Sequence, residues 1–146
     1  QGYTEILYLN SATKEYIDEF GSSNFFAVKG DKYITPLSES VLPSITNKTL
    51  QQVAQDFGMT VEKRKIRVEE LADFEEAAAC GTAVVITPMS HIDDKPHIAG
   101  SEVTNTYRFF PDGTVGPVCT KLYKNITGIQ FGELPDTHGW CHYIEM

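Results

Sequence analysis

The chain has 146 residues and a formal net charge of -8, with 41% hydrophobic and 11% aromatic residues. This composition supports one folded core and excludes an intrinsically disordered protein. The longest basic run is only Lys63-Arg64-Lys65, so we expect no nucleic-acid partner, because nucleic-acid binding requires a basic surface. The longest apolar-leaning stretch, residues 77–89, is too short and too interrupted by polar residues to cross a membrane, so no membrane partner is expected.

The first third of the chain has the pattern of a β meander. Runs rich in β-forming residues alternate with turn residues, which predicts strands at 5–9, 16–20, 25–28 and 33–35. The cluster Gly21-Ser22-Ser23-Asn24 predicts a turn, and Lys29-Gly30-Asp31-Lys32 predicts the turn of a hairpin.

Helical and extended patterns alternate in the rest of the chain. Apolar residues at 50, 53, 54 and 57 predict an amphipathic helix that Ser44 or Thr46 caps, and a second helix is predicted to begin at Pro117. Further elements are expected as strands at 60–66 and 84–87, the second of them buried, and a short helix at 68–71. Turns at 93–96 and 111–113 mark a more irregular region. The mixture predicts one α/β or α+β unit.

Cysteine and histidine usage indicates neither disulfides nor a metal site. Cys80, Cys119 and Cys141 are far apart and form no C-x-x-C pair, which favours reduced thiols in a cytoplasmic protein. His138 and His142 have the spacing of a helical metal pair, but the glycine between them disfavours a helix and no second ligand pair exists. We therefore predict no metal.

Three short motifs carry candidate chemistry. Residues 42–46 lead into the first helix, where unpaired amides and the positive end of the dipole suit an anion, although an ordinary capped helix start is the commoner explanation. In Cys80-Gly81-Thr82-Ala83 the glycine would admit a ligand close to the backbone and the threonine would add a hydroxyl donor; a tight turn is the alternative. Glu19 lies in an apolar run and either points to water or needs a cationic partner.

Taken in order, these motifs resemble the C-terminal half of branched-chain amino acid aminotransferases, the fold-type-IV enzymes that use pyridoxal 5'-phosphate. Residues 42–46 are similar to the phosphate-binding L-P-G-[IV]-[TV] of that family, with Ser44 in place of glycine, and residues 81–83 match its G-T-A loop. The similar segments are 2–9, 16–26, 42–46, 80–88, 116–118 and 127–132, with Trp140 downstream. The resemblance implies a mixed α/β (α+β) large domain whose sheet forms a pseudo-barrel with flanking helices.

The resemblance also implies a cofactor site. Glu19 matches the glutamate that faces the pyridine nitrogen, and Leu42 matches the apolar residue packed on the cofactor ring. Ile45 and Thr46 match residues whose backbone amides hold the phosphate, and Thr82 matches a further phosphate ligand. An ionised carboxylate at Glu19 would keep the ring nitrogen protonated, which strengthens the ring as an electron sink.

For the substrate, the backbone of Thr82 and Ala83 matches the seat of the substrate carboxylate. The Schiff-base lysine of the family, and an arginine that also holds the phosphate, lie upstream of the segment that begins at Gly2, and no lysine of this chain occupies a matching position. We therefore expect no catalytic residue here. Residues 1–146, which begin without an initiator Met, are interpreted as a single C-terminal cofactor-binding domain of a longer aminotransferase, inactive alone.

The implied parent protein exchanges an amino group between leucine, isoleucine or valine and 2-oxoglutarate. Its partners would be small amino acids and 2-oxo acids, and the full-length protein would be a homodimer. Another fold-type-IV enzyme, a D-amino acid aminotransferase or an aminodeoxychorismate lyase, is an alternative, although residues 127–130 and Trp140 favour the branched-chain group. A non-catalytic binding domain that retains the fold is the second alternative.

Overall fold

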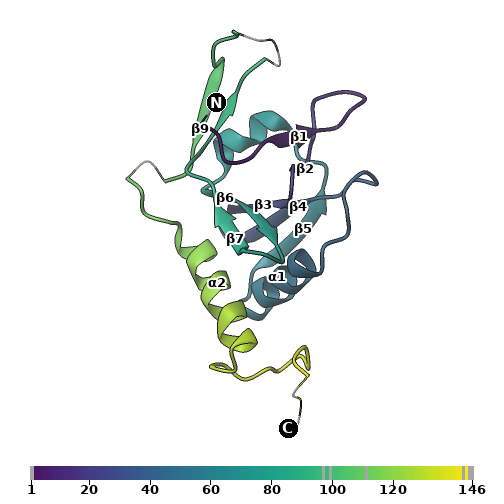
Figure 1. Ribbon diagram of the computed structural model, residues 1–146, viewed down its shortest axis with the longest axis vertical. Coiled ribbons are helices and arrows are strands. Elements are labelled where there is room, and N and C mark those ends of the chain that lie inside the picture. The colour runs from purple at the N-terminus through teal and green to yellow at the C-terminus, as the bar shows by residue number, and fades with distance from the viewer. Residues whose placement is uncertain (1, 97, 99, 111, 143, 145–146) are drawn as a thin grey trace.

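The computed structural model describes residues 2–96, 98, 100–110, 112–142 and 144. The elements follow in the order β1 (Leu7–Leu9), β2 (Ile17–Phe20), β3 (Asn24–Lys29), β4 (Lys32–Pro36), α1 (Ile45–Asp56), β5 (Thr60–Arg64), the 3-10 helix η1 (Val68–Asp73), β6 (Glu76–Gly81), β7 (Val85–Pro88), β8 (His91–Asp94), β9 (Asn105–Arg108) and α2 (Pro117–Gln130). Strands and helices are mixed along one chain, so the predicted α/β (α+β) fold class is confirmed (Figure 1).

Seven strands form one sheet that branches at β3. One path runs β1-β2-β3-β4-β5, and β6 pairs with β3 and with β7. Among the strands of the described residues, only β4 and β5 pair in parallel, because α1 carries the chain from the end of one strand back to the start of the other. Among the described residues the pairings do not run round a closed cylinder, so the pseudo-barrel stays a prediction.

The central strand β3 is buried on both faces. Phe25 and Ala27 belong to one hydrophobic cluster, whereas Phe26 and Val28 belong to the other, and all four are fully buried. This follows from the two-residue period of a strand, which sends neighbouring side chains to opposite faces. The strand is apolar at every position from 25 to 28 for this reason, rather than alternating with polar residues.

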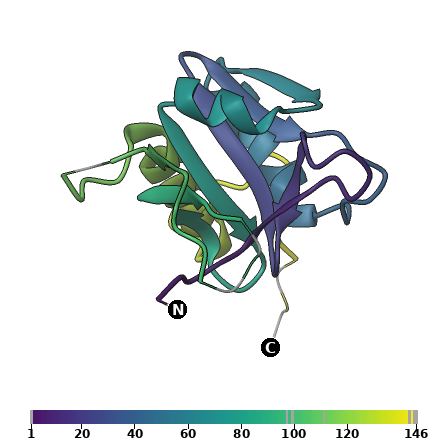
Figure 2. The same ribbon diagram turned by 90° about the horizontal axis from the view of Figure 1, so that it is seen from above.

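Both long helices cover one face of the sheet. Leu50, Val53 and Ala54 of α1 and Leu122 and Ile126 of α2 pack into the cluster that contains Phe26. Figures 1 and 2 show α1 and α2 together on this face, with η1 on the opposite side. The predicted helices and their apolar stripes are therefore confirmed. Within the described residues no helix is long and apolar enough to cross a membrane.

Two expectations for the second half of the chain were wrong in part. The strand predicted at 84–87 is present as β7, but it was expected to be buried, whereas it lies at the end of a branch of the sheet next to β6 and buries only Ile86. The region expected to be irregular contains the hairpin of β8 and β9, so Asp93 and Asp94 are in a strand. The turn expected at 111–113 is present at Asp112 and Gly113, while Pro111 lies outside the described residues.

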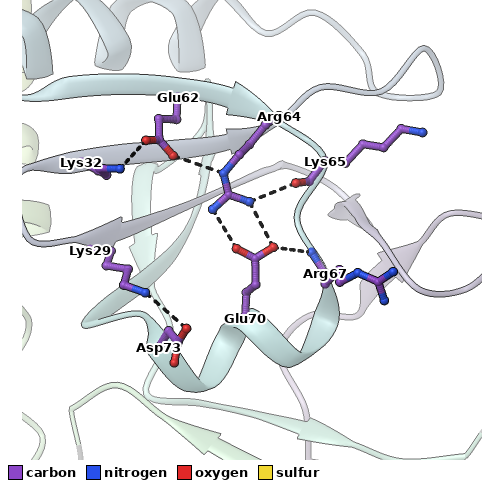
Figure 3. Close-up of polar contacts among 8 residues, drawn as sticks. All are labelled: Lys29, Lys32, Glu62, Arg64, Lys65, Arg67, Glu70 and Asp73. Carbon is purple, nitrogen blue, oxygen red and sulfur yellow. Dashed lines mark hydrogen bonds and ion pairs between the residues drawn. The ribbon is translucent and has the colours of Figure 1, made fainter.

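An ion-pair network attaches η1 to the end of β5 (Figure 3). The Arg64 guanidinium donates to both carboxylate oxygens of Glu70, at 3.0 and 2.7 Å, and its Nε donates to Glu62 at 3.2 Å. Lys32 on β4 extends the network, since its Nζ lies 2.6 Å from a carboxylate oxygen of Glu62. Glu70 also accepts from the backbone amide of Arg67 at 2.8 Å, so one carboxylate both caps η1 and ties it to the sheet.

Candidate functional site

Asn24, the first residue of β3, lies where three of the predicted segments meet. Its side-chain nitrogen lies 3.1 Å from the Leu42 carbonyl oxygen and 3.4 Å from Glu19 Oε2. Glu19 and Asn24 face each other in the β2–β3 register, and Cys80 faces Asn24 from β6. The tertiary structure therefore brings the Glu19 strand and the 42–46 loop together and places the start of the Gly81 turn beside them.

The sequence left open whether Glu19 points to water or to the interior. In the structure Glu19 is half-buried, which is intermediate between the two. Its neighbours Ile17, Asp18 and Phe20 are buried, while Glu19 itself keeps partial access to water. No cation of the described part of the chain pairs with it, and Asn24 is the side chain that reaches its carboxylate. A half-buried carboxylate with one long hydrogen bond can still take a cationic partner from outside the chain.

The 42–46 loop presents a helix start whose first amides are free. Ser44 is the N-cap of α1, and its hydroxyl accepts from the Asn47 amide at 3.1 Å, so the predicted Ser44 cap is confirmed. The backbone amides of Ile45 and Thr46 have no acceptor among the residues that the structure describes. Amides of this kind, at the positive end of a twelve-residue helix, suit a bound phosphate.

A buried polar network holds this helix start in place. Asn47 Oδ1 accepts from the Tyr33 hydroxyl at 2.8 Å and from Gln51 at 3.1 Å, and Asn47 Nδ2 donates to the Thr35 hydroxyl at 2.9 Å. The Thr35 hydroxyl in turn donates to the Phe25 carbonyl at 2.8 Å. Each of these side chains is thus paired with another, which makes the position of the loop relative to β3 and β4 specific.

Leu42 and Ile45 present apolar side chains to water at this loop. Their exposed fractions are 74% and 81%, although the loop beneath them is anchored by buried groups. Leu42 also lines a depression of about 170 Å³ together with Asn24, Ser44, Lys48 and Lys63. Glu19, Ile45, Thr46, Thr82 and Ala83 do not line this depression, so it is a neighbour of the predicted site rather than the site itself.

Thr82 and Ala83 occupy an exposed turn between β6 and β7. The turn ends in a strained residue, since Val85 has a φ of +62°, a region that β-branched side chains avoid. The Ile86 amide donates to the Val84 carbonyl at 2.7 Å, which closes a γ-turn around Val85. Strain of this kind at a predicted ligand-binding turn is a frequent property of functional sites.

The turn between β6 and β7 also lies beside the turn between β2 and β3, the strand pair in which Glu19 and Asn24 face each other. A Cβ placed on Gly81 would lie 3.6 Å from Ser23 Cβ, in the turn between β2 and β3. Ser23 Oγ is a buried polar atom without a partner in the described structure. Contacts therefore link Gly81 to the residue that precedes Asn24, but in the described part of the chain no hydrogen bond joins Thr82 or Ala83 to Ile45 or Thr46.

Asn24 itself was not predicted as a site residue, because an Asn after a serine turn has the ordinary sequence signature of a turn.

Two of the three thiols are buried, and the His138 imidazole pairs with a carboxylate. Cys80 and Cys119 are buried free thiols and Cys141 is a half-buried one. Burial raises the pKa of Cys80 to about 12 and also raises the pKa of Cys119, so both stay protonated and unreactive at neutral pH. His138 contacts Asp56 at 2.7 Å and stacks on Trp140. No group of three His, Cys, Asp or Glu side chains in the described residues could hold a metal ion.

These elements define a mixed α/β domain in which the loop that leads into helix α1 is linked through Asn24 to a half-buried carboxylate. The family model described as Amino-transferase class IV matches residues 1–92, which is more than half of the chain, and the chain belongs to this family.

Individual relatives agree with this assignment. The branched-chain-amino-acid aminotransferase of Haemophilus influenzae is 40% identical over 98% of this chain and 40% of its own length. The chloroplastic branched-chain amino acid aminotransferase 2 of Humulus lupulus is 38% identical over 96% of this chain and 32% of its own length. The chain thus spans well under half the length of these curated relatives.

Solved structures share the fold. The branched-chain amino acid aminotransferase from Escherichia coli has a TM-score of 0.76 at 29% identity and is matched over 95% of this chain and 42% of its own. The branched-chain aminotransferase of the thermophilic archaeon Thermoproteus uzoniensis, solved with norvaline, has a TM-score of 0.72 at 29% identity and is matched over 90% of this chain and 39% of its own. A further branched-chain amino acid aminotransferase, from T.th., was solved in complex with N-(5'-phosphopyridoxyl)-L-glutamate; it has a TM-score of 0.79 at 27% identity and is matched over 97% of this chain and 43% of its own. The predicted fold-type-IV family is therefore confirmed.

Proposed function

We propose that residues 1–146 are the cofactor-binding domain, the C-terminal part, of a longer pyridoxal-phosphate-dependent aminotransferase. The parent exchanges an amino group between leucine, isoleucine or valine and 2-oxoglutarate. The observation that carries this proposal is the meeting at Asn24 of the half-buried Glu19 carboxylate and the 42–46 loop. The names of the relatives from Haemophilus influenzae, Humulus lupulus and Mycolicibacterium smegmatis, each a branched-chain aminotransferase, support the substrate class over the D-amino acid and aminodeoxychorismate alternatives.

The residues of this chain fit such a cofactor in three ways. Glu19 supplies a carboxylate for a protonated ring nitrogen, and Leu42 supplies an exposed apolar side chain for the ring. The amides of Ile45 and Thr46, and the Thr82 hydroxyl, are donors for a phosphate. When bound, pyridoxal phosphate supplies the electron sink that lets the substrate Cα–H bond break.

The turn at Thr82 and Ala83 is proposed to orient the substrate. Its exposed backbone, held by the γ-turn at Val85, offers amides for the substrate carboxylate. The lysine that moves the proton lies outside these residues in this proposal, since none of Lys14, Lys29, Lys32 and Lys48 matches the family position. The domain alone is then inactive.

The setting of the full-length protein is also a proposal. We infer a cytoplasmic homodimer whose partners are small amino acids and 2-oxo acids. Three free cysteines, two of them buried, suit a reducing compartment.

Glu19→Gln in the full-length protein tests the proposal. The change keeps shape but removes the charge that holds the ring nitrogen protonated, so single-turnover conversion of leucine to its 2-oxo acid should slow by about a hundredfold, roughly 2.7 kcal/mol of barrier. Glu15→Gln is the matched control, because Glu15 is exposed and its ion pair with Arg67 is a long one, at 3.9 Å. Equal rates for both variants would refute the role of Glu19, and a full-length protein that prefers D-alanine to L-leucine would refute the substrate class.

A further inference from the structure

The side-chain amide of Asn24 donates two hydrogen bonds, one to each of two different parts of the site. One contact is to the Leu42 carbonyl oxygen at 3.1 Å, and the other is to Glu19 Oε2 at 3.4 Å. The residue as a whole is only 6% exposed, so water does not replace either contact freely. A single planar group with two donors can hold two acceptors at a fixed separation.

The backbone of Asn24 is fixed just as firmly. The residue faces Glu19 in β2 and Cys80 in β6, so both edges of β3 are paired at this point. The Phe20 amide donates to the Ser23 carbonyl at 2.8 Å and closes the turn that leads from β2 to β3. The Asn24 side chain therefore extends from a rigid base to the Leu42 loop.

We propose that Asn24 is a positioning residue that couples the Glu19 carboxylate to the phosphate-binding loop. It sets the distance between the group that contacts the cofactor ring and the amides of Ile45 and Thr46 that follow Leu42. The inference rests on the proposed function, because it assigns the two ends of one cofactor to Glu19 and to the loop. Asn24 touches neither the ring nor the phosphate in this proposal and acts only through its two acceptors.

The test uses the full-length protein loaded with pyridoxal phosphate whose ring nitrogen is labelled with ¹⁵N. Its chemical shift reports the protonated fraction of the ring nitrogen, and dialysis reports the rate at which the cofactor is lost. Asn24→Ala removes both donors, so we expect a smaller protonated fraction and about tenfold faster cofactor loss. Asn24→Asp, which keeps the shape but has no donor and repels Glu19, is expected to change both readouts in at least equal measure and serves if the alanine variant folds poorly.

Asn47→Ala is the matched control. Asn47 is also a buried asparagine that anchors the start of α1, but its contacts go to Tyr33, Thr35 and Gln51 and not to Glu19. We expect it to lower the melting temperature and to speed cofactor loss while the ring-nitrogen shift stays as in the parent. If Asn47→Ala moves that shift as far as Asn24→Ala does, the effect is general loosening and the coupling role is refuted.

A double-mutant cycle separates this inference from the proposed function. If Asn24 acts through Glu19, its effect on the ring-nitrogen shift disappears in a Glu19→Gln background, whereas its effect on cofactor loss through Leu42 persists. Should Glu19→Gln alone leave the shift unchanged, the assignment of Glu19 fails and the coupling fails with it. Should Glu19→Gln move the shift while neither Asn24 variant does, only the role of Asn24 is refuted.

Discussion

The Glu76 carboxylate caps helix α2, accepting from the Cys119 backbone amide at 2.8 Å across 43 residues of sequence. Its other oxygen accepts from the Val118 amide at 2.9 Å. Glu76 is buried, at the start of β6, so the negative charge is matched by two amides at the positive end of the helix dipole. Gly116 leaves room for this carboxylate, since a Cβ at that position would overlap the Glu76 side chain.

Glu76→Gln should destabilise the chain by about 1–3 kcal/mol, because an NH₂ group would then face one of the two amide donors. Denaturant unfolding followed by circular dichroism measures this change. Glu75→Gln is the control. Glu75 is exposed and accepts from the Gly30 amide at 3.0 Å, so we expect its free energy of unfolding to change by less than about 0.5 kcal/mol. An equal loss for both variants contradicts the capping role.

Val85→Gly should relieve backbone strain and weaken the proposed substrate site. A φ of +62° costs a β-branched residue about 1–3 kcal/mol, while glycine accepts it at an entropic cost of roughly 0.5–1 kcal/mol. Because Val85 also packs on the cluster that contains Phe26, Val85→Ala is the control: it removes the same contacts but keeps the Cβ at a positive φ. Val85→Gly is expected to be about 1 kcal/mol more stable than Val85→Ala, with a higher KM for leucine in the full-length protein because the turn loses its fixed shape. A Val85→Gly variant no more stable than Val85→Ala would show that the γ-turn is not strained.

The contact between His138 and Asp56 makes stability depend on pH in the acidic range. The hydrogen bond from His138 lowers the pKa of Asp56 below its usual 3.8. A carboxyl whose folded pKa is depressed stabilises the fold fully above its unfolded value, and this contribution is lost as the pH falls through the folded pKa. Melting temperatures of the parent and of Asp56→Asn should therefore converge as the pH falls below about 4. Curves that stay parallel from about pH 7 to about pH 2 would contradict this linkage.

Arg64→Lys should destabilise the attachment of η1 to β5 by about 0.5–1 kcal/mol, because lysine cannot reproduce the paired contacts of the guanidinium with Glu70. The partial exposure of both side chains limits the loss. Urea unfolding provides the measurement. Arg67→Lys is the comparison, because the ion pair of Arg67 with Glu15 is exposed and 3.9 Å long, and its replacement should change the free energy of unfolding very little. Equal effects would mean that the network in Figure 3 adds nothing beyond surface charge.

Local patterns in the sequence were sufficient to predict those helices and turns whose sequence signatures lie within a few residues of one another. The apolar spacing of α1, its Ser44 cap and the β3–β4 hairpin were predicted correctly, because side-chain periodicity, capping and turn chemistry act over one or two turns of chain. The family resemblance named Glu19, Leu42, Ile45 and Thr46 from short ordered motifs in the same way as Thr82 and Ala83. The roles that it gives to all six residues stay predictions.

Features that depend on pairing between segments far apart in the sequence were decided only by the tertiary structure. β6 was not predicted, since a run of alanines has no strand signature until β3 pairs with it along residues 24–28. The β8–β9 hairpin and the outer position of β7 also follow from which strands find partners, not from the residues within them. Asn24 could not be singled out beforehand, because its two acceptors lie 5 and 18 residues away and meet it only when the loop folds onto the sheet. Sequence periodicity specifies an element and its buried face, whereas contacts between elements depend on long-range packing that no local pattern encodes.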